Sequence, residues 1–188
     1  MIYKAINYYS RPTQILHWLT VILVLVAFIY GPGGSEERIY SAARDFDRQL
    51  HETLGLCVLT LFILRILWRG IDKHPEPPPV ARWMTITAGV VQVALYVLLF
   101  ALPLTAIFGV WLEGHPLTLL GGVEIHPPLA KSHALGETIT EIHAWLGDTI
   151  MWLVGIHAAA ALFHHFILKD RVLLSMLPHR NEISEHQN

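Results

Sequence analysis

Residues 142–168 read IHAWLGDTIMWLVGIHAAAALFHHFIL. This run is long enough to cross a bilayer, which needs about 20 consecutive apolar residues in a helix. It is too long for a strand, and it lacks the alternation of apolar and polar residues that a membrane β-barrel strand shows. Its one acidic residue, Asp148, lies near its start. The run therefore predicts a transmembrane helix that carries two histidines well apart, His143 and His157.

Three earlier apolar runs have the same character. The first contains VILVLVAFIY, the second ends where Arg65 and Arg69 lie one turn apart, and the third is interrupted by Pro103. None of them alternates as a barrel strand would. We predict an all-α fold, an integral membrane four-helix bundle in a single domain over residues 1–188. Its helices are predicted at about 13–31, 50–69, 84–112 and 142–168.

The composition agrees with a membrane protein and excludes several other classes. Hydrophobic residues make up 53% of the 188-residue chain and charged residues 15%, against about 25% charged residues in soluble domains. A chain so apolar is not disordered. Its net charge of −2 indicates no nucleic-acid partner, because such proteins show a basic face. The single cysteine, Cys57, excludes an intrachain disulfide and a CxxC metal site.

Lysine and arginine are distributed unevenly between the two sides of the predicted bundle. One side carries Lys4, Arg11, Arg65, Arg69, Lys73, Arg82, Lys169, Arg171 and Arg180. The other side carries Arg38, Arg44, Arg48 and Lys131. Because cytoplasmic segments are richer in these residues, we expect the N and C termini to face the cytoplasm. The outer surface of the four helices is then expected to contact membrane lipid.

Four histidines lie within or at the edge of the apolar runs, in two layers. His17 is near the start of the first predicted helix, and His51 starts the second, which runs the opposite way. On the fourth helix, His143 and His157 share one face in a left-handed bundle and lie about 21 Å apart along the axis. Matching depths predict the pairs His17 with His157, on the cytoplasmic side, and His51 with His143, on the outer side.

A pair of histidines from two helices suits a haem better than a zinc ion. A structural zinc site uses four clustered protein ligands, whereas a porphyrin supplies four nitrogens itself and leaves two axial positions. Gly55 and Gly147 each follow a histidine by one turn, which would leave room for a macrocycle beside the backbone. The alternative is that the histidines only make hydrogen bonds between helices, as polar residues in membranes often do.

Several segments together resemble the bacterial cytochrome b561 family of four-helix, di-haem inner-membrane cytochromes. They are RPTQILHW at 11–18, QLHETLG at 49–55, EIHAWLG at 141–147 and GIHAAAALFHH at 155–165, with Lys169-Asp170 following. The resemblance covers nearly the whole chain. It implies two haem b cofactors in the bacterial inner membrane, with His17, His51, His143 and His157 as axial ligands to the haem iron.

The resemblance also implies an activity. Within the family, the short chain is most similar to proteins that oxidise superoxide to oxygen and reduce ubiquinone, which makes superoxide the expected electron donor. An alternative is a haem b anchor subunit that passes electrons between a partner dehydrogenase or hydrogenase and the quinone pool. A third, different alternative is a haem-free transporter lined by histidines. The sequence leaves the oligomeric state open.

Other polar residues are candidates for supporting roles. Arg11 on the cytoplasmic side and Arg44 and Arg48 on the outer side are candidate partners of the haem propionates, or else contact lipid headgroups. His164 lies two turns after His157, so His164 or the adjacent His165 is a candidate to bind a quinone carbonyl and relay protons. Their alternative role is as histidines at the membrane boundary.

Overall fold

Four long helices form the molecule. The structure, a computed structural model, describes residues 8–178 apart from 32, 34–35 and 73–79. Its long helices are α1 (Arg11–Ile29), α3 (Asp45–Arg69), α4 (Arg82–Glu113) and α5 (His133–Phe166). All four are long and apolar enough to cross a membrane. The chain is therefore an all-α bundle of the integral membrane class, as the four apolar runs predict.

Local sequence explains where α1 begins and where α4 ends. Ser10 precedes α1, where its side chain accepts a hydrogen bond from the Thr13 backbone N–H at 3.5 Å, and Pro12 occupies the first turn, a position that suits its fixed backbone angle. Gly114 ends α4 with a φ of 88°, a left-handed conformation that glycine adopts without steric cost. These signals fix the residue at which α1 begins and the residue at which α4 ends.

Two helices extend beyond the apolar runs that predict them. α3 begins at Asp45 and α5 at His133, whereas the runs start at residues 50 and 142. The additional turns contain polar residues such as Asp47, Glu137 and Glu141, so hydropathy alone does not mark them. Of the cations that predict the orientation, Lys4, Lys73 and Arg180 lie outside the described residues.

The helices pack in two extensive pairs, α4 with α5 and α1 with α3, and α3 also packs on α4. A small buried cluster lies where the four helices meet, formed by Val58, Leu98, Leu99 and Ile150. Many other apolar side chains on the helices are exposed. An apolar exterior around a small core is expected when lipid, rather than water, surrounds the bundle.

Glycines allow α4 and α5 to cross closely. A Cβ added to Gly136 would lie 2.8 Å from the backbone nitrogen of Glu113, and one added to Gly109 would lie 2.6 Å from Thr140 Oγ1. Small residues at such crossings let two backbones approach, which is the usual basis of helix association in membranes. The α4–α5 pair therefore depends on these two positions.

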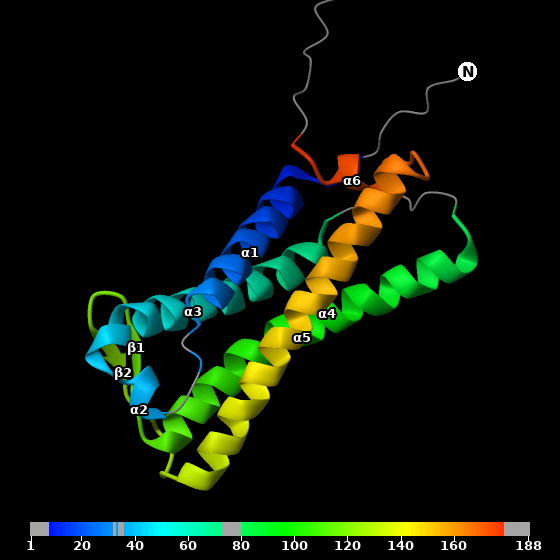
Figure 1. Cartoon of the computed structure of the whole chain (residues 1–188). Helices are drawn as coiled ribbons and strands as arrows, with labels where there is room; N and C mark the ends of the chain where they lie inside the picture. Colours follow the sequence, from blue (N-terminus) through cyan, green and yellow to red (C-terminus); the bar gives the residue numbers. More distant parts are fainter. Residues whose placement is uncertain (1–7, 32, 34–35, 73–79, 179–188) are drawn as a thin grey trace, which may run out of the picture.

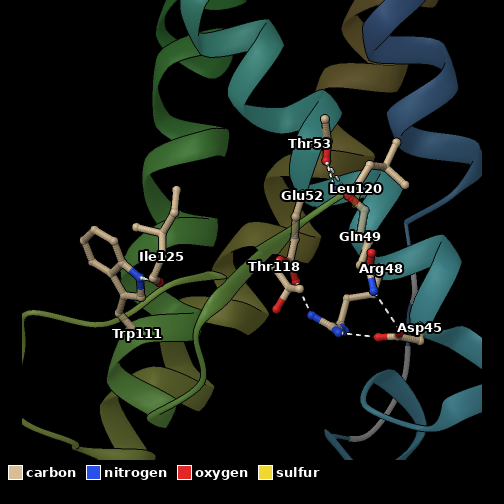
Figure 2. A network of polar contacts seen from close by, with 9 residues as sticks. All are labelled: Asp45, Arg48, Gln49, Glu52, Thr53, Trp111, Thr118, Leu120 and Ile125. Carbon is tan, nitrogen blue, oxygen red and sulfur yellow. Dashed lines mark hydrogen bonds and ion pairs between the residues drawn. The ribbon is translucent and has the colours of Figure 1, made fainter. Parts of the chain in front are cut away.

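Short elements close one end of the bundle. They are α2 (Glu36–Ile39), the 3-10 helix η1 (Ala42–Arg44) and an antiparallel hairpin of β1 (Leu117–Leu119) and β2 (Val123–Ile125). α3 anchors the hairpin, because Glu52 accepts a hydrogen bond from the Thr118 backbone N–H and Thr53 Oγ1 accepts one from Leu120 at 2.9 Å (Figure 2). We call this side the hairpin end.

The opposite end carries α6 (Val172–Ser175) beside the start of α1 and the end of α5 (Figure 1). The buried Gln14 side chain donates to the Ser175 carbonyl at 3.1 Å, and Trp18 Nε1 donates to the Met176 carbonyl at 2.9 Å. These bonds tie the segment that follows α5 to α1. We call this side the α6 end.

Candidate cofactor site

His51 of α3 and His143 of α5 face each other near the hairpin end. Their ring centroids are 5.9 Å apart and the ring planes are nearly perpendicular, at 88°. A metal–imidazole nitrogen distance of about 2.0–2.1 Å places the ring centres of two axial imidazoles on one metal about 6 Å apart. The structure therefore brings this predicted pair together at a spacing that suits two ligands on opposite sides of one metal.

Backbone carbonyls orient both rings. His51 Nδ1 lies 2.7 Å from the carbonyl oxygen of Ala27, and His143 Nδ1 lies 2.9 Å from that of Leu102. Since a carbonyl only accepts hydrogen bonds, each Nδ1 donates, and the lone pair of each neutral ring is on Nε2. A ligand histidine is normally held in this way, with one ring nitrogen donating to a carbonyl and the other free for the metal.

The two acceptors come from features of the helices themselves. Ala27 is within the last four residues of α1, whose carbonyls have no partner inside the helix. Leu102 immediately precedes Pro103 in α4, and the Thr105 hydroxyl lies 3.3 Å from His143 Nδ1. The end of α1 thus leaves the Ala27 carbonyl free for His51, whereas the Leu102 carbonyl accepts from both the Thr105 hydroxyl and His143.

A large apolar cavity lies between these helices. Its empty space is about 1220 Å³, a figure that includes the mouth open to the surroundings, and its lining includes His51, His143, Gly55 and Gly147. A Cβ added to either glycine would meet no atom within 4 Å. Small-molecule and cofactor sites are typically concave and mostly apolar, with a few polar groups that fix the orientation of the ligand. The space and the two Nε2 lone pairs fit a flat macrocycle such as haem.

Arg48 borders the same cavity and is almost fully buried, with 10% of its side chain exposed. It makes ion pairs with Asp45 and with Glu52, the latter at 3.1 Å (Figure 2). Its Nε has no hydrogen-bond partner among the residues that the structure describes. A buried donor without a partner is costly, so this position fits an acidic group of a bound cofactor.

The other two arginines predicted as propionate partners lie differently. Arg44 forms an ion pair with Asp47 at 2.9 Å and is 43% exposed, and it is not part of the cavity lining. Arg11 is exposed in the first turn of α1. Of the three predicted arginines, Arg48 is the one that lines the cavity, and Arg11 and Arg44 do not line it.

The second predicted pair lies toward the α6 end. His17 of α1 is partly buried and His157 of α5 is exposed, and Arg65 of α3 lies near both. The Arg65 guanidinium is 3.3 Å from His17 Nδ1 and 5.5 Å from the centre of the Tyr96 ring. Because guanidinium only donates, His17 Nδ1 is an acceptor here, unlike Nδ1 of His51 and His143.

His164 and His165 lie in the last turn of α5. His164 Nδ1 forms a close ion pair with the Asp170 carboxylate, and both side chains are mostly buried, at 19% and 15% exposure. His165 Nδ1 is buried and has no partner within the described part of the chain. The two candidates for quinone binding therefore have different surroundings, which their sequence positions do not reveal.

Sequence reasoning missed several residues that support these histidines. They are Ala27, Leu102, Arg65 and Asp170. Two of them act through backbone carbonyls, which leave no signal in side-chain identity. The charged residues did offer a signal, because an ionisable residue at the edge of an apolar run usually has a nearby partner.

The fold and this site define a class: a multi-pass membrane protein in which two histidines from different helices, His51 and His143, meet inside the bundle. The family model described as prokaryotic cytochrome b561 matches residues 8–179. The chain belongs to this family. It is accordingly a multi-pass protein of the bacterial inner membrane that binds haem b and transfers electrons.

Curated relatives match over nearly their full length. The chain is 32% identical to cytochrome b561 homolog 2 of Escherichia coli K12, over 90% of this chain and 90% of that protein. It is 31% identical to the probable superoxide oxidase CybB of Yersinia pestis, over 87% and 92%. It is also 32% identical to cytochrome b562 of Cereibacter sphaeroides, over 90% and 94%.

Proposed function

We propose that the chain holds two haem b groups, one at each end of the bundle. His51 and His143 are the proposed ligands near the hairpin end, and His17 and His157 are those near the α6 end. Binding through His17 Nε2 would require Nδ1 to carry the proton and to release its contact with Arg65. The observation that carries this proposal is the His51–His143 pair, with centroids 5.9 Å apart and both Nδ1 atoms held by carbonyls. Arg48 is the proposed partner of a propionate at that site.

The proposed reaction is the oxidation of superoxide to oxygen and the reduction of ubiquinone. When bound, the haem groups would be held by the two pairs of histidines and would supply one-electron transfer. The name of the Yersinia pestis relative supports superoxide as the donor. The apolar bundle supports a lipid-soluble acceptor, since ubiquinone reaches its site from the membrane.

The proposed orientation places the α6 end in the cytoplasm. Within the described residues, Arg11, Arg69, Arg82, Lys169 and Arg171 lie toward that end, in keeping with the positive-inside rule. Superoxide then meets the hairpin end, and quinone is reduced near His164 and His165. The imidazole N–H of either histidine is the proposed hydrogen-bond donor to a quinone carbonyl.

A partner-free assay tests this function. Purified protein is mixed with an enzymatic source of superoxide and a short-chain ubiquinone, and quinol formation is followed. We expect quinol to form at a rate proportional to the protein concentration and to stop when superoxide dismutase is added. A protein that shows reduced b-type bands but forms no quinol would contradict the proposed reaction and favour a haem b anchor for a partner dehydrogenase or hydrogenase.

A further inference from the structure

The turn that follows α5 folds back onto the helix it leaves. α5 ends at Phe166, and the Asp170 backbone N–H donates to the carbonyl of His164 at 3.1 Å. Lys169, between them, has a φ of 53°, a left-handed conformation that is uncommon for residues other than glycine. Residues other than glycine that are held in such conformations concentrate at functional sites.

The consequence of this turn is a close pair between His164 and Asp170. One carboxylate oxygen of Asp170 contacts His164 Nδ1, and the other accepts a hydrogen bond from the Val172 backbone N–H at 3.1 Å. Both carboxylate oxygens are therefore engaged, which fixes the carboxylate in space. With Nδ1 bound to the carboxylate, the remaining nitrogen, Nε2, is the one available to a ligand.

We propose that Asp170 is the positioning residue of a proton-donating pair, in which it holds His164 so that Nε2 delivers a proton to the quinone. This inference rests on the proposed function. A carboxylate that accepts from Nδ1 fixes the orientation of the ring and stabilises its protonated form, as in other histidine–carboxylate pairs.

The proton balance of quinone reduction calls for such a group. Two electrons supplied through the haem groups and two protons convert the quinone to quinol, and each carbonyl oxygen becomes a hydroxyl. The imidazolium of His164 loses its Nε2 proton to one quinone oxygen and regains one from water at the membrane face, and the other quinone oxygen takes the second proton from water. Ionisable neighbours are His165, Lys169 and Arg171, and α6, packed against α5, contributes none.

The experiment uses the haem-loaded protein, reduced beforehand and freed of excess reductant, and mixes it with saturating short-chain ubiquinone in a stopped-flow instrument. Reoxidation is followed by the b-type absorption band in water and in deuterium oxide. Asp170→Asn is the key variant, because asparagine keeps an oxygen for the Val172 N–H and removes the charge. Asp72→Asn is the control, since Asp72 lies at the same end and binds Ser10 and Thr13 instead.

We expect Asp170→Asn to slow reoxidation at least tenfold and His164→Asn about 10²-fold or more, the usual range for loss of a general acid. The solvent isotope effect on reoxidation should change in Asp170→Asn and in His164→Asn. In the control, Asp72→Asn, it should equal that of the wild type. If Asp170→Asn does not fold, Asp170→Ser takes its place, because the serine hydroxyl also offers an oxygen to the Val172 backbone N–H. A wild-type rate and isotope effect in either Asp170 variant would overturn the inference.

The same experiment separates this inference from the proposed function. If quinone does not reoxidise the reduced wild-type protein, the proposed quinone reduction itself is wrong, and the proton-donating pair is wrong with it. If the wild type reacts and the Asp170 variants react equally well, only the role of Asp170 is wrong.

Discussion

At the scale of single residues, the carbonyls of Ala27 and Leu102 define how His51 and His143 are held. Each accepts from an Nδ1, so each Nε2 keeps its lone pair for a metal. The backbone thereby selects the tautomer that a haem ligand needs. His17 differs, since Arg65 is the neighbour of its Nδ1.

The pair at the hairpin end gives the first prediction. His143→Ala should reduce the haem bound per protein by about half, because a metal site of two protein ligands loses one of them. Haem content is measured from the pyridine derivative and protein by amino-acid analysis. His126→Ala, in the exposed hairpin region, is the control and should bind as much haem as the wild type. Unchanged haem content in His143→Ala would show that this histidine is not a ligand.

The open space at Gly147 gives the second prediction. A Cβ there meets nothing within 4 Å, and the residue lines the cavity. Gly147→Leu should therefore leave the fold intact, filling the cavity and excluding haem. Gly89→Leu is the matched control, since Gly89 also has open space around it but is absent from the cavity lining. Equal haem content in both variants, with equal helix content by circular dichroism, would refute this use of the cavity.

At the scale of elements, sequence predicts the spanning helices well and their ends poorly. The apolar runs identify all four helices because lipid requires continuous apolar stretches. The polar turns of α3 before residue 50 and of α5 before residue 142 carry no such signal. The hairpin of β1 and β2 is likewise set by tertiary contacts from Glu52 and Thr53, which a local pattern does not contain.

The residues of the candidate site also differ in whether the sequence alone could predict them. His17, His51, His143 and His157 could be chosen by depth, since an ionisable residue in a membrane marks a function. Arg44 and Arg48 could not be told apart by sequence, because both lie just before His51. Their places in the fold differ: Arg48 lies on α3 and lines the cavity, whereas Arg44 ends η1 and pairs with Asp47.

The close crossing of α4 and α5 gives the third prediction. Gly136→Ala would place a methyl group 2.8 Å from the backbone nitrogen of Glu113, so the helices must separate. We expect a loss of about 1–3 kcal/mol, the usual cost of overpacking, seen as a lower midpoint of thermal unfolding in detergent. Gly89→Ala, with no neighbour within 4 Å, should not lower it. A Gly136→Ala protein as stable as the wild type would show that the two helices do not pack so closely.

At the scale of the whole molecule, the two histidine pairs and the two ends of the bundle correspond. His51 and His143 lie near the hairpin end and line the same cavity as the buried Arg48–Glu52 ion pair. His17 and His157 lie toward α6, next to Arg65. Two cofactors, one at each pair, would together carry electrons across the apolar interior. The direction of electron flow would then depend on which end of the bundle faces the cytoplasm.

That orientation is the fourth prediction. The described residues at the α6 end include Arg69, Arg82, Lys169 and Arg171, and excess lysine and arginine remains cytoplasmic because it is translocated poorly. A green fluorescent protein fused after Asn188 should fluoresce, since it folds in the cytoplasm, and alkaline phosphatase fused there should be inactive. The same two reporters inserted at Gly121, in the turn of the hairpin, should give the opposite pattern. Active phosphatase at Asn188 would reverse the orientation, placing His164 and Asp170 on the side where superoxide is expected.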